Sequence, residues 1–418
     1  MSGGGPAALP HDPYAALRHP GFRWFVLSMG LVTLGMQMQA VVVAWQVYER
    51  TGDPLALGLV GLSEALPFLG VALFGGHVAD RFNRRRICVL SVLALALCGS
   101  LLFGFTRASA TGPWARAVVP IYGVIFLTGL VRAFYRPAHV ALSADLLPKD
   151  LYANGSTWRV SVFHTCMVVG PAIGGLVYAW GGALAAHGLV TLLILGGLPG
   201  LLRLHYLPKA APTRATSVLQ SLAEGLRFVF SRRLLLGALS LDLFAVLFGG
   251  AVAVLPVFAR EVLRTGPEGL GILRAAPAVG SVAMGLVLAH LPPLRRAGRI
   301  LLTCVAAFGV CMIAFALSHS FLLSLLLLAA SGAVDNVSVV LRATLLQTLT
   351  PDHMMGRVSS VNQVFIGSSN ELGAFESGLA ARLLGLVPSV VFGGCMTLLV
   401  VATTAWKVPE LRKLDRVG

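Results

Sequence analysis

The chain has 418 residues, of which 56% are hydrophobic and 12% are charged, and its formal net charge is +15. A soluble globular domain carries about 25% charged residues, so this composition excludes an ordinary water-soluble fold and predicts a chain that lies in lipid. The basic residues are not gathered on an aqueous domain. We therefore expect no nucleic-acid partner and assign the positive charge to loops at the membrane surface.

Residues 1–22 are polar and rich in glycine and proline, and the apolar run behind them is too long for the core of a signal peptide. We expect them to form a cytoplasmic N-terminal tail without a cleaved signal. The six cysteines lie within apolar runs and show no CxxC spacing. This pattern predicts neither disulfides nor a zinc site.

A helix that crosses a bilayer needs about 20 mostly apolar residues, and twelve runs of roughly that length follow one another along the chain. The predicted spans are residues 24–48, 56–79, 87–106, 117–141, 159–180, 183–206, 234–258, 268–290, 299–318, 321–345, 357–381 and 386–406. An even number places both termini on one side of the membrane. Most loop lysines and arginines fall on that same side, which the positive-inside rule assigns to the cytoplasm.

The longest connection between spans, residues 207–233, divides the chain into two sets of six. We predict an N-terminal six-helix bundle over 23–206, a cytoplasmic linker over 207–233, a C-terminal six-helix bundle over 234–406 and a cytoplasmic tail over 407–418. The second half of the linker predicts a short amphipathic helix on the membrane surface. Its apolar side is predicted to carry Leu219, Leu222, Leu226 and Phe230.

The two halves repeat each other weakly in sequence. The loop ADLLPKDLYANGS after the fourth span aligns with QTLTPDHMMGRVS after the tenth, and the same alignment places Gly129 on Gly332 and Arg132 on Asp335. Internal repeats of this kind are common in transporters. We therefore predict two pseudo-symmetric bundles, with a base and an acid at corresponding depths.

Between the second and third spans, residues 76–85 read GHVADRFNRR. Together with the twelve spans, this stretch resembles the G-x-L-A-D-R-x-G-R-[KR] signature of the major facilitator superfamily, with Val78 in place of leucine and Asn83 in place of glycine. The resemblance implies a latch that holds the outward-facing state closed at the cytoplasmic end. Its predicted members are Gly76, Asp80, Arg81, Arg84 and Arg85. The alternative is that the arginines of residues 84–86 only anchor the topology.

A second motif lies in the fifth span, where VVGPAIGGLV carries Gly170, Pro171, Gly174 and Gly175. It resembles the G-P-x-x-G-G motif of the superfamily's antiporters, which implies export rather than uptake, while ordinary small-residue packing is the alternative. The stretches GLVRAFYRPAHVAL and LQTLTPDHMMGRVSSVN are similar to the branch that contains enterobactin exporters and macrolide efflux pumps. Glutamates 371 and 376 in NELGAFESG depart from that branch, so the cargo does not follow from the resemblance.

Ionisable side chains near the middle of a bilayer are costly and therefore mark candidate functional sites. Arg132 and Asp335 are the first candidates for proton coupling, with a purely structural ion pair as the alternative. Asp242, Glu64 and Glu371 are further candidates.

Polar residues within the spans are candidates for contact with the substrate. They are Gln37, Arg136, Gln363 and Asn370. The same side chains can instead join helices to one another, and Arg136 can instead brace a loop acid such as Asp145. We expect Glu376, nearer the outer surface, to be solvated.

The histidines show no metal-ligand spacing, and the sequence contains no G-x-x-x-x-G-K-[ST] motif. We therefore expect no metal and no other cofactor, and we expect a proton gradient to supply the energy. No nucleophile, base and orienting acid occur together, so we do not expect an enzyme.

These observations predict an all-α, multi-pass protein of the bacterial cytoplasmic (inner) membrane, working as a monomer on a small-molecule substrate within the lipid bilayer. The predicted function is proton-coupled export of small amphipathic molecules, such as siderophores or drugs, by alternating access. A symport-type importer of a small solute is one alternative. A non-transporting membrane sensor or scaffold is the other.

Overall fold

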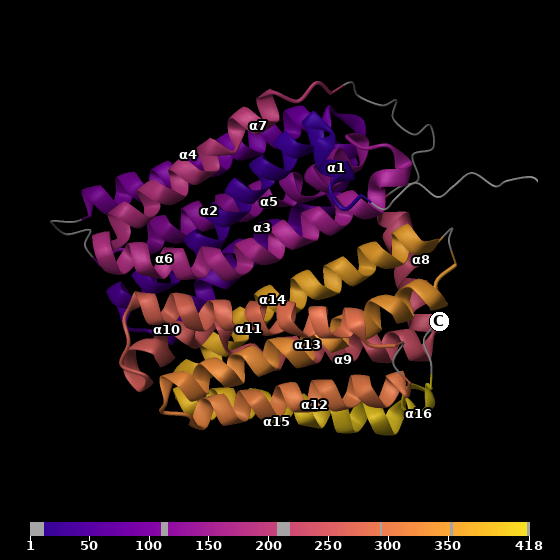
Figure 1. Cartoon of the computed structure of the whole chain (residues 1–418). Helices are drawn as coiled ribbons and strands as arrows, with labels where there is room; N and C mark the ends of the chain where they lie inside the picture. Colours follow the sequence, from indigo (N-terminus) through magenta and orange to yellow (C-terminus); the bar gives the residue numbers. More distant parts are fainter. Residues whose placement is uncertain (1–11, 110–115, 207–217, 293–294, 352–353, 416–418) are drawn as a thin grey trace, which may run out of the picture.

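The computed structural model describes residues 12–109, 116–206, 218–292, 295–351 and 354–415. Every regular element in these ranges is a helix (Figure 1). Of the predicted N-terminal tail and linker, residues 1–11 and 207–217 lie outside the described residues.

The first half of the chain forms seven α-helices and one short 3-10 turn. They are α1 (Ala15–Arg18), α2 (Pro20–Thr51), α3 (Pro54–Arg81), α4 (Arg84–Ala108), α5 (Val119–Asp145), η1 (Lys149–Leu151), α6 (Tyr152–Gly196) and α7 (Leu198–Leu202). Local sequence sets the ends of these helices. Asp53 caps α3 by accepting from the backbone N–H of Leu55 at 2.9 Å, and Asn83 caps α4 by accepting from the N–H of Arg86 at 3.1 Å. Proline at the first position of α2 and α3 costs no helical hydrogen bond.

The second half begins with a helix of the predicted linker and continues through the remaining long helices. Its elements are α8 (Val218–Ser231), α9 (Arg233–Gly249), η2 (Ala251–Val254), α10 (Leu255–Val257), η3 (Phe258–Val262), α11 (Pro267–His290), α12 (Ala297–Leu317), α13 (Phe321–Leu349), α14 (Met355–Leu384), α15 (Leu386–Lys407) and α16 (Pro409–Lys413). Predicted span 7 is therefore not one continuous helix. It ends as an α-helix at Gly249 and continues through η2, α10 and η3.

Ten helical segments in the described residues are long and apolar enough to cross a membrane. Predicted spans 5 and 6 fall in one of them, residues 149–202, which breaks at Gly182 with φ of 67°. This break coincides with the predicted boundary between 180 and 183, and positive φ is a conformation that glycine adopts readily. Predicted span 11 corresponds to α14, which is long enough but too polar to belong to the ten. The chain is thus an all-helical, multi-pass membrane protein.

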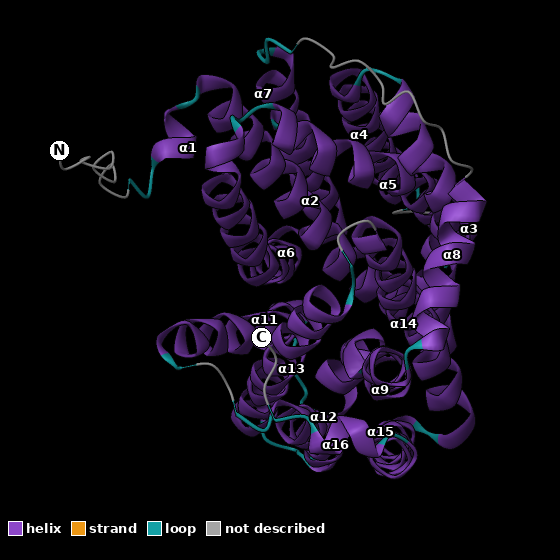
Figure 2. Cartoon of the chain, turned by 90° about the vertical axis from the view of Figure 1, so that its right-hand side faces the viewer, coloured by secondary structure: helices purple, strands orange, loops and turns teal. Residues whose placement is uncertain are grey.

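The helices form two groups that follow the order of the chain, as the colours of Figure 1 show. In the first group α2 packs on α6, and α5 packs on α3 and α4; in the second, α11 and α12 pack on α13, and α15 packs on α12 and α9. Each group has its own buried apolar core. The groups meet along two helix pairs, α6 with α11 and α3 with α14, and Figure 2 shows α6 next to α11.

The helix α8 confirms the helical part of the linker prediction but changes its apolar face. Leu222 and Leu226 pack beside Val229, which is fully buried, whereas Phe230 is 61% exposed. The side chain of Leu219 is not among those described. Residues 222, 226 and 229 are spaced four and three apart and share one helix face more closely than residue 230 does. This face packs against α14 and α9.

Candidate functional site

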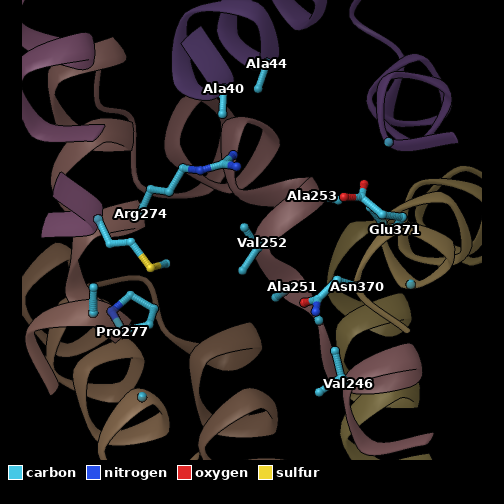
Figure 3. Close-up of a pocket in the computed structure, with 18 of the residues that line it drawn as sticks. Ala40, Ala44, Val246, Ala251, Val252, Ala253, Arg274, Pro277, Asn370 and Glu371 are labelled. Atoms are coloured by element: carbon cyan, nitrogen blue, oxygen red, sulfur yellow. The ribbon is translucent and has the colours of Figure 1, made fainter. Parts of the chain in front are cut away.

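A cavity of about 560 Å³ lies between the two halves of the chain. Its wall is drawn from α2, α3, α5 and α6 in the first half, and from α9, η2, α11, α12, α13 and α14 in the second (Figure 3). Much of the wall is apolar, including Met36, Val43, Ile125, Phe308 and Met312. A large, mainly apolar cavity with a few polar groups is typical of a small-molecule site.

Arg132 and Glu64 form an ion pair in this cavity, joining α5 to α3. The helices approach closely here because residue 129 is glycine. A Cβ at Gly129 would meet the backbone carbonyl of Glu64 and would lie 3.0 Å from the ring of Pro67. The charge of Arg132 is therefore neutralised within its own half of the chain, and its ion-pair partner is not the acid with which the repeat aligns it.

A second ion pair joins Asp242 of α9 to Arg342 of α13. Arg342 is buried, and its Nε also donates to the carbonyl of Ser338 at 3.2 Å. Asp242 lines the cavity, as a proton-coupling candidate should, but its carboxylate is neutralised by this guanidinium. This partner of Asp242 was not predicted from the sequence.

Asp335 also lines the cavity, on α13. Among the described residues it has no hydrogen-bond or ion-pair partner. One turn earlier, Gly332 lies against Pro277 of α11, where a Cβ would meet the proline carbonyl. Gly129 and Gly332, which the repeat aligns, thus both allow a close crossing of a helix that contains an internal proline.

Glu371 of α14 and Arg274 of α11 are two further charges on the cavity wall, and Figure 3 shows them on different helices. Glu371 lies in the electrostatic field of Arg132, Arg274 and Arg136, but no ion pair joins it to them in the described structure. Arg274 was not predicted as a site residue, although an arginine in the middle of an apolar run was a sufficient signal.

The polar substrate candidates divide into two groups. Gln37 and Asn370 line the cavity, whereas Arg136 and Gln363 are not among the described residues of its wall. The Asn370 amide donates to the carbonyl of Ile366 at 2.8 Å, within its own helix.

Arg136 does not brace Asp145, which contradicts the alternative offered for it. The two residues are nine positions apart on α5, a rise of about 13 Å. Asp145 is instead bound by Arg84 at 2.6 Å, and it accepts a hydrogen bond from the Tyr206 hydroxyl at 2.8 Å.

The predicted latch residues make contacts within the first half of the chain. Arg84 pairs with Asp145 and lies 3.7 Å from Asp80, while Arg85 donates to the carbonyls of Leu201 at 2.9 Å and Leu202 at 2.5 Å. The side chain of Asp80 is 62% exposed. Arg81 is also exposed, and the space around Gly76 is open. In the described residues, no hydrogen bond or ion pair of this motif reaches the second half.

The glycines of the predicted antiporter motif lie at two different helix crossings. A Cβ at Gly170 would lie 2.6 Å from the Cβ of Gln37, and one at Gly174 would lie 3.1 Å from the carbonyl of Met38, both on α2. Gly175 faces the other half, where it lies against Pro267 and Gly271 of α11. The motif therefore joins α6 both to its own bundle and to the opposite one.

The two halves touch at the end of the cavity that carries Asp53. Arg382 of α14 pairs with Asp53 at 2.8 Å, and the Tyr48 hydroxyl donates to Glu261 of η3. Close backbone contacts between Gly58 and Gly378 add to this closure. The cavity is thus closed at the end opposite to Asp80.

The sequence matches the family model described as transmembrane secretion effector, over residues 11–417. It is 28% identical to an enterobactin exporter of Shigella flexneri, across 94% of this chain and 93% of that protein. It is also 28% identical to the multidrug efflux pump Tap of Mycolicibacterium fortuitum, across 91% of this chain and 94% of that protein.

Solved structures with the same fold include a POT family transporter in complex with 5-aminolevulinic acid, with a TM-score of 0.73 at 12% identity across 94% of this chain and 96% of that one. A D-xylose-proton symporter gives a TM-score of 0.69 at 15% identity, across 93% of this chain and 98% of that one. At these identities the likeness concerns the fold alone. The match over nearly the whole chain, together with the cavity between two helical bundles, shows that this chain belongs to the transmembrane secretion effector family of the major facilitator superfamily of transporters.

Proposed function

We propose that this transporter is a proton-coupled exporter of small amphipathic molecules, such as siderophores or drugs, that works by alternating access. The observation that carries the proposal is Asp335, a carboxylate on the cavity wall without a hydrogen-bond or ion-pair partner among the described residues. Asp242 and Glu64 are neutralised by arginines, and Glu371, which also has no ion-pair partner among the described residues, lies in the field of Arg132, Arg274 and Arg136. A proton that binds Asp335 therefore changes the net charge of the cavity without first breaking an ion pair.

Alternating access requires two states in which the cavity opens to opposite sides. In support of such a cycle, the halves are joined at the Asp53 end by contacts that can separate, while the Asp80 motif at the other end makes no hydrogen bond or ion pair with the second half in the described residues. We propose that the Asp53 end is extracellular, so that this state is open to the cytoplasm. The Asp80 motif would then close the cytoplasmic end in the other state.

The proposed topology has twelve spans and both termini in the cytoplasm. It counts α14 as a span and counts residues 149–202 twice, before and after the break at Gly182. Asn370 and Glu371 of α14 line the cavity, as polar residues of a less apolar span can do. We place the protein in the bacterial inner membrane as a monomer that uses the proton gradient and no cofactor.

Export of this kind receives support from the enterobactin exporter and the efflux pump to which the sequence is similar. The experiment is uptake into everted membrane vesicles across an imposed pH gradient, with a siderophore, a macrolide and a lipophilic cation as separate cargoes. Wild-type vesicles should accumulate at least one of them when the interior is acidic. Asp335→Asn should bind this cargo but lose the response to the gradient, whereas Asp335→Glu should keep it.

The matched control is Asp150→Asn, which changes an exposed acid of η1 outside the cavity. It should transport as the wild type does. Gradient-driven uptake that persists undiminished in Asp335→Asn would show that another acid carries the proton. Loss of transport in the control would attribute the effect to handling of the membranes rather than to Asp335.

A further inference from the structure

Arg274 is a charged residue of the cavity wall that the proposed proton cycle does not use. It lies on α11, one helical turn before Pro277, which also lines the cavity. Figure 3 shows its side chain extending from α11 toward the middle of the cavity, with the guanidinium on the side of Ala40. Arg274 thus presents a cation to the middle of the cavity.

Arg274 differs from the other two deep arginines because it has no partner. Arg132 pairs with Glu64 and Arg342 pairs with Asp242, whereas Arg274 makes no hydrogen bond or ion pair with any described residue. Its counter-charge is Glu371, which attracts it through the cavity without touching it. A guanidinium removed from bulk water is costly unless it is hydrogen-bonded, and an unsatisfied one is a candidate ligand site.

We infer that Arg274 binds an anionic group of the transported molecule, and that the substrate class is therefore amphipathic organic anions. A guanidinium offers paired N–H donors in a fixed plane, which suits a carboxylate or a similar oxyanion. The apolar side chains of the cavity would hold the rest of the molecule. This inference rests on the proposed transport function but not on its direction or its coupling ion.

The site for the anion is separate from the proposed proton site. Arg274 lies on α11 and Asp335 on α13, and no hydrogen bond or ion pair joins them among the described residues. Glu371 is instead the group with which the anion competes for the guanidinium, so removing its charge should favour the ligand.

The test measures equilibrium binding without a proton gradient, using three probes that differ only in their head group: pyrenebutyrate, pyrenebutanol and pyrenebutylamine. The protein is held in lipid nanodiscs, and quenching of tryptophan fluorescence is read after subtraction of empty nanodiscs. Wild type should bind pyrenebutyrate more tightly than the other two. Arg274→Gln should weaken pyrenebutyrate binding roughly 10- to 100-fold, the range expected for lost hydrogen bonds to a charged group, and should leave pyrenebutanol binding unchanged.

Three further variants complete the design. Arg274→Lys should keep part of the preference for the anion, Glu371→Gln should strengthen anion binding, and Arg299→Gln, at an exposed position of α12, should behave as wild type. Equal binding of the three probes by wild type would overturn the inference, as would an unchanged preference in a correctly folded Arg274→Gln. If Arg274→Gln does not fold, a preference unchanged in Arg274→Lys and in Glu371→Gln overturns it.

This outcome is independent of the vesicle experiment. An Arg274-dependent preference for the anion in a protein without gradient-driven uptake would remove the proton-coupled mechanism and keep the substrate class. Gradient-driven uptake of a cationic cargo, with no role for Arg274, would do the reverse.

Discussion

Gly175 and Gly271 meet where α6 crosses α11, and a Cβ built on Gly271 would come within 3.2 Å of the Gly175 Cα. The contact joins the two halves of the transporter, unlike the contact of Gly174, which lies against α2 of the same half. Small residues allow helix backbones to approach this closely in a membrane. The closed end of the cavity therefore depends on the absence of side chains at this crossing.

Gly175→Ala should impair transport more than Gly174→Ala does. A Cβ at Gly175 would collide with the Pro267 carbonyl, whereas one at Gly174 needs a shift of only a few tenths of an ångström. Overpacking costs about 1–3 kcal/mol, which would reduce the population of the present state roughly 5- to 150-fold. Gly174→Leu should be as damaging as Gly175→Ala. The measurement is initial uptake rate per folded protein.

The control for this series is Gly104→Ala in α4, where no atom lies within 4 Å of the added Cβ. It should leave transport unchanged. If Gly175→Ala transports as well as Gly104→Ala, the close crossing does not limit the cycle.

Tyr48→Phe should open the cavity more often at the Asp53 end. The change removes the hydroxyl that donates to Glu261 of the other half and keeps the ring. A hydrogen bond to a charged group contributes about 1.5–3 kcal/mol at most sites, so the population of the open form should rise at least several-fold. A thiol reagent that cannot cross the membrane, applied outside to Ala253→Cys in a cysteine-free background, should react correspondingly faster.

Tyr152→Phe changes a tyrosine at the start of α6, far from this contact, and is the matched control. An unchanged labelling rate in Tyr48→Phe would mean that Gly58, Gly378 and the Asp53–Arg382 pair keep this end closed without the hydroxyl. The exposed Asp53–Arg382 pair alone should have a smaller effect, about 0.2–1 kcal/mol.

Asp80→Asn and Arg84→Gln should have different consequences, although both lie in one motif. Asp80 is exposed and makes only a 3.7 Å contact with Arg84, so its loss should not change thermal stability but should slow export through the other state. Arg84 pairs with the buried Asp145 at 2.6 Å, so its loss should lower the melting temperature. Thermal unfolding and accessibility of engineered cysteines at both ends would measure the two effects. Equal destabilisation by both changes would contradict this division.

Arg132→Gln should destabilise the protein because Glu64 would be left as an unpaired carboxylate inside the membrane. Removal of one partner of a fully buried pair costs about 3–5 kcal/mol. The loss here should be smaller because the side chains are 33% and 23% exposed. The double variant Arg132→Gln/Glu64→Gln should recover much of it. Since the ion-pair partner of Arg132 is Glu64, neither variant should abolish the response to the proton gradient that is assigned to Asp335. Unfolding measurements on the two single variants and the double one would test the pairing. Additive losses would show that the two residues are not coupled.

Much of the architecture followed from apolar run length, because a membrane fixes how long a spanning helix must be. The break near Gly182 and the aligned glycines 129 and 332 could also be predicted from the sequence, since glycine marks backbone conformations and close contacts that other residues rarely permit. Residues 357–381, predicted as a span, form α14, although this helix is too polar to belong to the ten apolar segments. Run length could not locate the non-α segments at the end of predicted span 7.

The ion pairs were much harder to predict from the sequence. Sequence spacing gives the depth of Arg132 in the membrane but not the direction in which its side chain leaves α5. Each residue turns an α-helix by about 100°. The spacing therefore could not decide between Glu64, which is the partner in the structure, and Asp335. For the same reason Arg342 and Arg274 could not be told apart, although one is neutralised by Asp242 and the other has no partner in the described structure.

The two proline-containing crossings have a consequence for what can pass through this protein. Gly129 fixes α5 to α3 beside Glu64 and Pro67, and Gly332 fixes α13 to α11 beside Pro277, in each case with backbone against backbone. Helices packed this closely cannot move apart within one half. In the proposed cycle each half should therefore move as a rigid body. The width of the cavity within each half should then be nearly the same in both states of the cycle. The helix contacts at Gly129 and Gly332 would therefore limit the size of the cargo without touching it.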